Sequence, residues 1–197
     1  GAHRDLHSFP TRRSSDLDVQ TIVQYAGGWN DAPKGKEIAL AMYEQKADII
    51  FQIAGGTGQG IFEAAQERGT YAIGVDSDQA TILEDTQPEL AAVVLTSMMK
   101  NVGESLYRGV DLFLNDELVF GQTEILGIAE GGVGLAYNDI YYDNTPENVL
   151  DLIDAVQEAV DNDQISIISV LDAEPATVGM GCDKMPATDF DASMYMQ

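Results

Sequence analysis

The stretch Asp48–Gly60, with the sequence DIIFQIAGGTGQG, joins an almost wholly apolar run to a glycine-rich turn. The apolar run is typical of a strand that is buried on both faces, as parallel strands between helix layers are. A helical pattern begins at Ile61, so the turn lies between the carboxyl end of a strand and a helix. Ligands of open α/β sheets bind at this edge. The stretch therefore predicts a ligand-binding turn in a parallel α/β sheet.

The flanking segments extend this pattern into a β-α-β-α-β unit. Strands are expected at 19–26, 48–54 and 71–75, and helices at 31–45 and 60–68. Asp31 followed by Pro33 is a typical helix start, and Gly69 is a typical helix stop. Because the connections are short, the strands should be parallel with right-handed crossovers, which places three strand ends at one edge of the sheet.

The second half of the chain continues the alternation. Further strands are expected at 92–98, 123–129 and 165–171, with helices after Lys100 and from Thr145 and Pro146 onward. In the first of these helices Val102, Leu106, Val110 and Phe113 would share one apolar face, although Gly103 and Gly109 weaken it. Residues 172–197 have no periodicity, and we expect a flexible tail there.

Composition excludes several classes of function. The 197 residues carry a formal charge of -23, which argues against nucleic acid or an anionic membrane surface as a partner. The lone cysteine, Cys182, offers no disulfide framework and no cysteine metal cluster. Both histidines, His3 and His7, lie near the N-terminus, and no stretch approaches the ~18 apolar residues of a membrane span. We therefore expect no metal site and no cofactor.

The N-terminal segment is set apart from the fold. Residues 7–17, HSFPTRRSSDL, resemble the translation of a sequencing-adapter oligonucleotide, so 1–17 is expected to be an artefactual or disordered segment. A natural basic arm is the alternative. No signal peptide is visible, and the adapter interpretation implies that the gene began further upstream.

Three predicted turns at the carboxyl edge suggest a ligand. They are residues 27–31, 55–60 and 76–78. Trp29 could stack on a purine, and Asp76 and Asp78 could accept hydrogen bonds from ribose hydroxyls. The alternatives are a packing role for Trp29 and a helix cap or solvated turn for the aspartates. Because two carboxylates without a nearby arginine repel a polyphosphate, a neutral nucleoside is favoured.

Known catalytic and phosphate-binding motifs do not fit. Gly60 is followed by Ile61 and Phe62 rather than by the lysine and hydroxyl of a P-loop. The dinucleotide-binding fingerprint requires two residues between its last two glycines, whereas only Gln59 lies between Gly58 and Gly60. A likeness to the glycine signature of tubulin-like GTPases covers only a few residues. No serine has a histidine partner in the part expected to fold. An enzyme is therefore not predicted.

Four motifs occur in order along the chain: YAGGWNDAPKG at 25–35, ADIIFQ with its glycine turn from 47, AIGVDSDQ at 72–79 and LTSMMK at 95–100. Together they resemble the basic membrane protein family, which comprises PnrA-like, lipid-anchored nucleoside-binding proteins that feed ABC transporters. The likeness covers about Asp18 to Leu171, including the turn EGGVG at 130–134. Two departures follow Lys100, where Asn101 and Gly103 replace the family's basic and acidic residues.

The resemblance implies a type I periplasmic-binding-protein-like α/β fold, in which a parallel sheet has helices on both faces. Residues 18–171 would be the C-terminal lobe of a two-lobed protein, together with elements that return to an N-terminal lobe absent from this sequence. Purine nucleosides (guanosine, inosine or adenosine) would bind between the lobes. The implied ligand-binding residues are Trp29, Asn30, Gly55, Gly56, Asp76 or Asp78, and Lys100; none is catalytic.

The resemblance also implies partners and a location. The whole protein would be lipid-anchored on the extracytoplasmic face of the cell membrane and would serve an ABC transporter permease and ATPase. The family's lipobox cysteine and second stacking aromatic belong to the absent part. A nucleotide-using α/β enzyme and a ligand-sensing regulatory protein on the same fold are the alternatives.

Overall fold

The computed structural model describes residues 21–165, which fall into two units. The larger unit is residues 26–145, and the described parts of the smaller one are 21–25 and 146–165. The predictions for residues 1–17, for most of the strand at 165–171 and for the tail at 172–197 lie outside the described residues.

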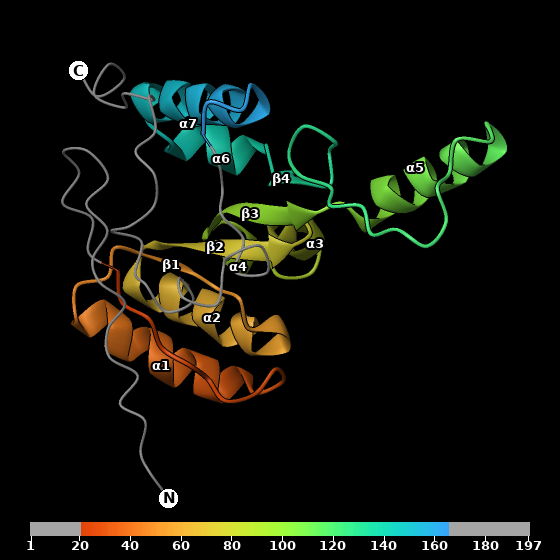
Figure 1. Ribbon diagram of the computed structural model, residues 1–197. Coiled ribbons are helices and arrows are strands. Elements are labelled where there is room, and N and C mark those ends of the chain that lie inside the picture. The colour runs from red at the N-terminus through yellow and green to blue at the C-terminus, as the bar shows by residue number, and fades with distance from the viewer. Residues whose placement is uncertain (1–20, 166–197) are drawn as a thin grey trace, which may run out of the picture. The chain divides into compact units, whose positions relative to one another are not determined.

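The larger unit alternates strands and helices (Figure 1). Its elements are α1 (Ala32–Glu44), β1 (Ile49–Phe51), a short 3-10 helix (Gly55–Thr57), α2 (Gly58–Arg68), β2 (Tyr71–Asp76), α3 (Gln79–Glu84), α4 (Pro88–Ala91), β3 (Val94–Lys100), α5 (Val102–Leu114), β4 (Val133–Leu135) and α6 (Asp139–Asn144). Asp31 caps α1, as predicted, because its side chain accepts a hydrogen bond from the backbone N–H of Lys34. The short helices α3, α4 and α6 were not predicted.

The four strands form one sheet in the order β1-β2-β3-β4. The first three are parallel, with Ile50 beside Ala72 and Ala72 beside Val94, while β4 runs antiparallel to β3. The predicted parallel β-α-β-α-β arrangement is therefore present, but it starts one strand later than expected. The strand predicted at 19–26 is wrong for its described residues, because residues 21–26 have no strand conformation.

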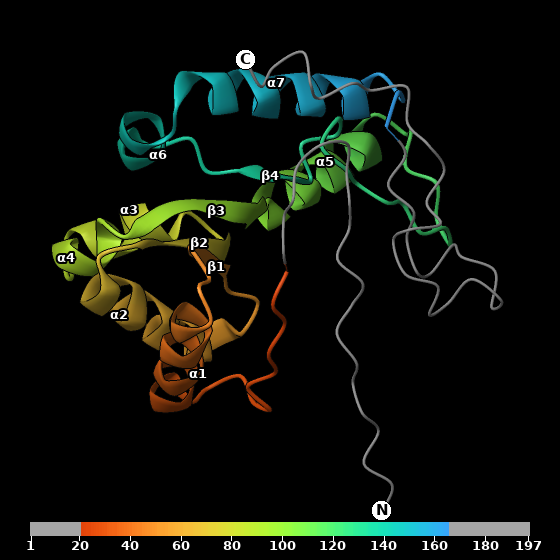
Figure 2. The same ribbon diagram turned by 90° about the vertical axis from the view of Figure 1, so that its left-hand side faces the viewer.

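Helices cover both faces of the sheet, as predicted. Figures 1 and 2 show α1 and α2 on one face and α6 on the other. The core lies between the sheet and α2, where Phe62 is the largest fully buried side chain and packs in one cluster with Ile50, Ala72 and Val94. Helices α1 and α2 meet closely at Gly60, since a Cβ there would overlap the carbonyl oxygen of Ala32.

The prediction that the first apolar run is buried on both faces is wrong. Ile50 is buried, whereas its neighbours Ile49 and Phe51 are 37% and 43% exposed. Successive side chains of a strand point to opposite faces, so Ile49 and Phe51 lie on the face opposite Ile50, and at β1 that face is only partly covered.

The helix after Lys100 is present as α5, but its apolar face is not covered. Val102, Leu106, Val110 and Phe113 are each at least half exposed, and no residue of α5 is buried. Figure 1 shows α5 extending from the end of β3 away from the sheet. The strand predicted at 123–129 does not form, and β4 lies within the predicted 130–134 turn and just beyond it.

The described part of the smaller unit contains α7 (Glu147–Asp161). The predicted helix is confirmed, but it begins slightly later than expected, with Pro146 at its N-cap and Thr145 as the C-cap of α6. No helix in the part of the chain that the structure describes is long and apolar enough to span a bilayer.

Candidate functional site

The parallel strands β1, β2 and β3 end at one edge of the sheet, and each end leads into residues predicted to bind ligand. Gly55 and Gly56 follow β1, Asp76 ends β2, and Lys100 ends β3. This edge is where ligands bind in open α/β sheets.

The turn that carries Trp29 is joined to the glycine turn through Thr57. The backbone N–H of Thr57 donates to the Trp29 carbonyl oxygen at 3.2 Å, and its hydroxyl donates to the Gly28 carbonyl oxygen at 3.0 Å. The same hydroxyl accepts a hydrogen bond from the backbone N–H of Asp31 at 2.9 Å. Thr57 is fully buried, so these bonds fix the two turns together.

The indole of Trp29 is 71% exposed and lies beside the glycine turn. A Cβ built on Gly55 would be 3.7 Å from Cε3 of the indole, and one on Gly56 would be 2.8 Å from Oδ1 of Asn30. Gly55 also has a φ of +56°, which favours glycine. Trp29 is therefore largely exposed rather than packed into the core, and its stacking on a ligand stays a prediction.

Asp76 lies at a sharp turn and pairs with Lys100. Its φ is +69°, an unusual value for a residue other than glycine, and Ser77 N–H donates to the Val75 carbonyl oxygen across it. Lys100 Nζ lies 2.8 Å from Asp76 Oδ1, and both side chains are more than half exposed. An exposed ion pair contributes little to stability, so both groups remain available to a ligand.

Asp78 is engaged differently. Its carboxylate accepts hydrogen bonds from the backbone N–H of Thr81 at 3.3 Å and from the Thr81 hydroxyl at 2.9 Å, which caps α3. It also accepts one from Nδ2 of Asn138 at 3.1 Å. The structure therefore gives Asp78 the helix-capping role that was an alternative for these aspartates, and it leaves Asp76 as the freer carboxylate.

Two glutamines were missed by the sequence analysis. Gln52 lies within the apolar run and is 1% exposed, and its Nε2 donates to Oε1 of Gln79 at 2.7 Å. A polar residue inside a run that is otherwise apolar was the available signal, because a buried amide must find partners. These two side chains connect the ends of β1 and β2.

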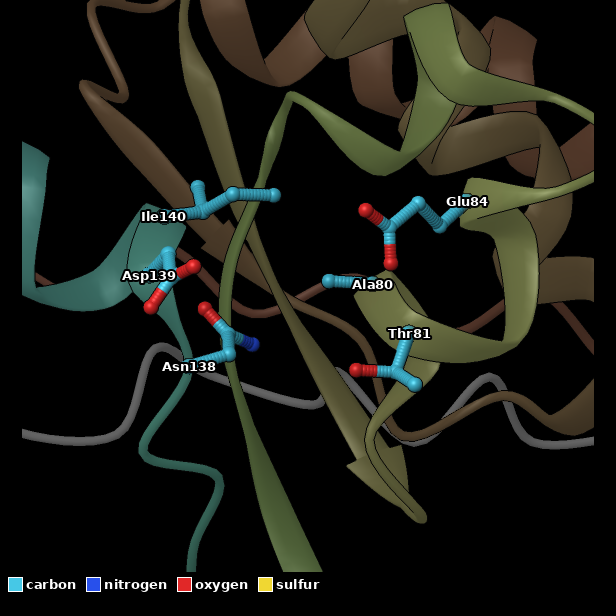
Figure 3. Close-up of a pocket in the computed structure, with 6 residues that line it drawn as sticks. All are labelled: Ala80, Thr81, Glu84, Asn138, Asp139 and Ile140. Atoms are coloured by element: carbon cyan, nitrogen blue, oxygen red, sulfur yellow. The ribbon is translucent and has the colours of Figure 1, made fainter.

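A small pocket lies beside Asp78 rather than at the Trp29 turn. It measures about 210 Å³ and is lined by Ala80, Thr81, Glu84, Asn138, Asp139 and Ile140 (Figure 3). Its volume is below the roughly 300–1,000 Å³ of typical ligand pockets. Since none of the predicted ligand residues lines it, we place the candidate site at the exposed strand ends instead.

The charged groups of the site do not form a metal centre. Among residues 21–165 there is no group of three or more histidine, cysteine, aspartate or glutamate side chains positioned to hold a metal ion. What the edge offers is an aromatic face, glycine backbone groups, and an acceptor and a donor in Asp76 and Lys100.

Comparison with known sequences identifies a family match. Residues 13–172 match the family described as ABC transporter substrate-binding protein PnrA-like. Basic membrane protein D of Borreliella burgdorferi is 34% identical over 136 residues, which are 68% of this chain and 38% of that protein. The ABC transporter nucleoside-binding protein BmpA of Lactococcus lactis is 29% identical over 167 residues, which are 80% of this chain and 46% of that protein. The chain thus spans less than half the length of these relatives.

Solved structures share the fold. An ABC transporter solute-binding protein from Aeropyrum pernix superposes with a TM-score of 0.56 at 22% identity, over 74% of this chain and 46% of that one. A transcriptional activator of the comK gene from Bacillus halodurans superposes with a TM-score of 0.60 at 23% identity, over 71% of this chain and 45% of that one. The same architecture is therefore found in proteins with different roles.

Proposed function

This chain belongs to the PnrA-like family of ABC transporter substrate-binding proteins, and from that membership we propose that it forms part of a nucleoside-binding site. The ligand class is purine nucleosides, such as guanosine, inosine or adenosine. The relative from Lactococcus lactis is itself named a nucleoside-binding protein.

The observation that carries the proposal is the exposed indole of Trp29 beside Gly55 and Gly56. A purine stacked on the indole would lie next to a backbone that has no side chains to exclude it. Stacking adds about 0.5–1.5 kcal/mol beyond the burial of apolar area. Asn30, which lies against Gly56, adds an amide that can bond the base edge or the sugar.

The pair formed by Asp76 and Lys100 suits the ribose. The carboxylate accepts hydrogen bonds from neighbouring hydroxyls, and the ammonium group donates to a hydroxyl or ring oxygen. Because the two charges neutralise each other, the pair gives no net attraction for a polyphosphate, and a neutral nucleoside fits better. In this assignment Asp76 contacts the ribose, while Asp78 caps α3.

Residues 18–171 are proposed to be the C-terminal lobe, with elements that pack on a second lobe. Two observations support this division: the match covers less than half of each relative, and the apolar face of α5 is exposed. Helix α5 and the residues up to Gly132 would return to the second lobe, and the nucleoside would bind between the lobes. Half of such a cleft should bind weakly by itself.

The remaining partners follow from the proposed transport role. The complete protein would be held by a lipid anchor at the extracytoplasmic face of the cell membrane and would deliver nucleoside to a permease and an ATPase. The binding site needs no catalytic residue and no cofactor. The family is a non-enzymatic class of binding protein.

Isothermal titration of guanosine into the complete protein tests the proposal. We expect micromolar or tighter binding, and Trp29→Ala should weaken it about tenfold. Trp29→Phe is the matched control, because it keeps an aromatic face and should retain most of the affinity. Absence of binding heat, or equal affinity for Trp29→Ala and wild type, would refute the proposal. Preference for GTP with Mg²⁺-dependent hydrolysis would instead favour an enzyme.

A further inference from the structure

A buried glutamine lies directly before the glycine turn. Gln52 is 1% exposed, and its Oε1 accepts a hydrogen bond from the backbone N–H of Ala54 at 3.1 Å. Ala54 immediately precedes Gly55, so the side chain of Gln52 holds the residue that leads into the turn. Its Nε2 donates to Oε1 of Gln79 at 2.7 Å, which satisfies both ends of the amide.

Gln79 continues the connection to the other two strands. Its Oε1 accepts a second hydrogen bond from the backbone N–H of Val75 at 2.8 Å. Its own backbone N–H donates to Oγ of Ser97, a fully buried residue of β3, at 3.2 Å. One oxygen atom of Gln79 thus joins the end of β1 to the end of β2, and its backbone joins both to β3.

Two glycines leave space for these amides. A Cβ on Gly58 would overlap the side-chain amide of Gln52. A Cβ on Gly74 would overlap Oγ of Ser97 and come within 2.7 Å of Oε1 of Gln79. Each amide therefore lies directly against a glycine backbone, and a side chain at either glycine would displace it.

The connection ends next to the unusual backbone of Asp76. A residue other than glycine holds a φ of +69° only where the surrounding structure imposes it. Val75, the preceding residue, is held through its N–H by Gln79 and through its carbonyl oxygen by Ser77. The conformation that presents Asp76 to Lys100 is therefore supported by Gln79.

We propose that Gln52 and Gln79 form an amide relay that positions the Asp76 carboxylate relative to the glycine turn. The role of this relay depends on the nucleoside site proposed above. In this assignment the two amides do not contact the ligand. They fix the distance between the glycine turn, which binds the base, and Asp76, which binds the ribose of the same nucleoside.

Two measurements on matched variants test the relay. Gln79→Met removes the acceptor at similar volume, Gln79→Glu keeps an acceptor oxygen for both bonds, and Gln87→Met is the control. Gln87 accepts from Nε2 of Gln59 at 3.1 Å, an amide pair of the same kind that is exposed. Hydrogen exchange of the Val75 amide is measured in this chain, and guanosine affinity in the complete protein.

In Gln79→Met the affinity should fall about tenfold, and the Val75 amide should exchange faster, because a buried donor loses its partner. The amide of Phe62 in the core should keep its protection. Gln79→Glu should restore the protection of Val75, and Gln87→Met should change neither quantity. Gln52→Met should weaken binding as well, and the double variant should lose less than the two separate losses combined, since both residues act in one relay.

Unchanged affinity in Gln79→Met, with affinity lost in Asp76→Asn, would overturn the relay and leave the nucleoside proposal standing. If the wild-type protein bound no nucleoside, the proposed function would be wrong, and hydrogen exchange would still test whether the two glutamines hold Val75. Rapid exchange of the Val75 amide in the wild-type chain would then contradict the relay.

Discussion

Lys100 Nζ lies 2.8 Å from Oδ1 of Asp76, across the ends of two adjacent parallel strands. Because the pair is exposed, breaking it should change the free energy of unfolding by less than about 1 kcal/mol. Asp76→Asn in the complete protein should nevertheless weaken guanosine binding about 10- to 100-fold, since a charged hydrogen bond to the ribose is lost. Calorimetric titration combined with denaturant unfolding measures both quantities.

Asp78→Ala is the matched comparison, because Asp78 caps α3 with two hydrogen bonds from Thr81. Loss of an N-cap should lower the free energy of unfolding by about 1 kcal/mol. Its effect on stability should therefore exceed its effect on affinity, the reverse of Asp76→Asn. If Asp78→Ala abolished binding while Asp76→Asn did not, the assignment of the ribose carboxylate would be reversed.

Gly60 sets the distance between α1 and α2. A Cβ at this position would overlap the carbonyl oxygen of Ala32 and lie 2.6 Å from the backbone N of Lys36. Gly60→Ala should therefore destabilise the chain by about 3 kcal/mol or more, because backbone has to move. Gly109→Ala in α5 is the control: a Cβ there meets nothing within 4 Å, and the change should leave stability equal or slightly raised. Urea unfolding of both variants that gave equal midpoints would contradict this account.

The sequence predicted the elements whose signals are local. The start of α1 at Asp31 and Pro33 and the end of α2 at Gly69 were confirmed, since capping chemistry is encoded within a few residues. The strands predicted at 19–26 and 123–129 failed in their described residues, because a strand also requires a partner to pair with. Apolar composition alone cannot supply that partner. Helices α3 and α4 were missed because they are shorter than the window over which helical periodicity can be recognised.

For the candidate site, the sequence likewise predicted the location but not every side-chain role. Parallel strands with short connections were enough to bring Gly55, Asp76 and Lys100 to one edge. The capping role of Asp78 depends on which of two nearby aspartates begins α3, and the relay of Gln52 and Gln79 depends on side-chain packing across strands. Neither follows from spacing along the chain.

Tyr43 predicts a pH dependence of stability. Burial raises its pKa to about 12 from an ordinary value of 10.0. Between these values the unfolded chain loses a proton that the folded chain keeps, so the stability contribution is complete below pH 10 and is lost as the pH rises toward 12. The loss should reach about 3 kcal/mol.

The contribution of Tyr43 is measured as the difference in free energy of unfolding between the wild type and Tyr43→Phe. Tyr43→Phe removes the ionisable hydroxyl and its hydrogen bond to the Tyr71 carbonyl oxygen at 3.3 Å, so it should lower stability modestly at neutral pH. Above pH 10 the difference in free energy of unfolding between the wild type and Tyr43→Phe should become smaller, since only the wild type loses this contribution. Denaturant unfolding across the range, with a difference that stayed constant, would rule out a raised pKa at Tyr43.

The uncovered face of α5 predicts self-association of this chain. Leu106 and Phe113 are 67% and 58% exposed on the same face, and burying such side chains against a second copy is favourable by about 1.5–3 kcal/mol each. Leu106→Glu together with Phe113→Glu should shift the chain toward monomer, as sedimentation velocity would measure. Gln87→Glu with Gln122→Glu adds the same two charges at exposed polar positions and should leave the association unchanged. Sedimentation of the wild-type chain as a monomer at tens of micromolar would show that the apolar face of α5 is stable in contact with solvent. The proposal that this face packs on a second lobe would then lose its main structural support.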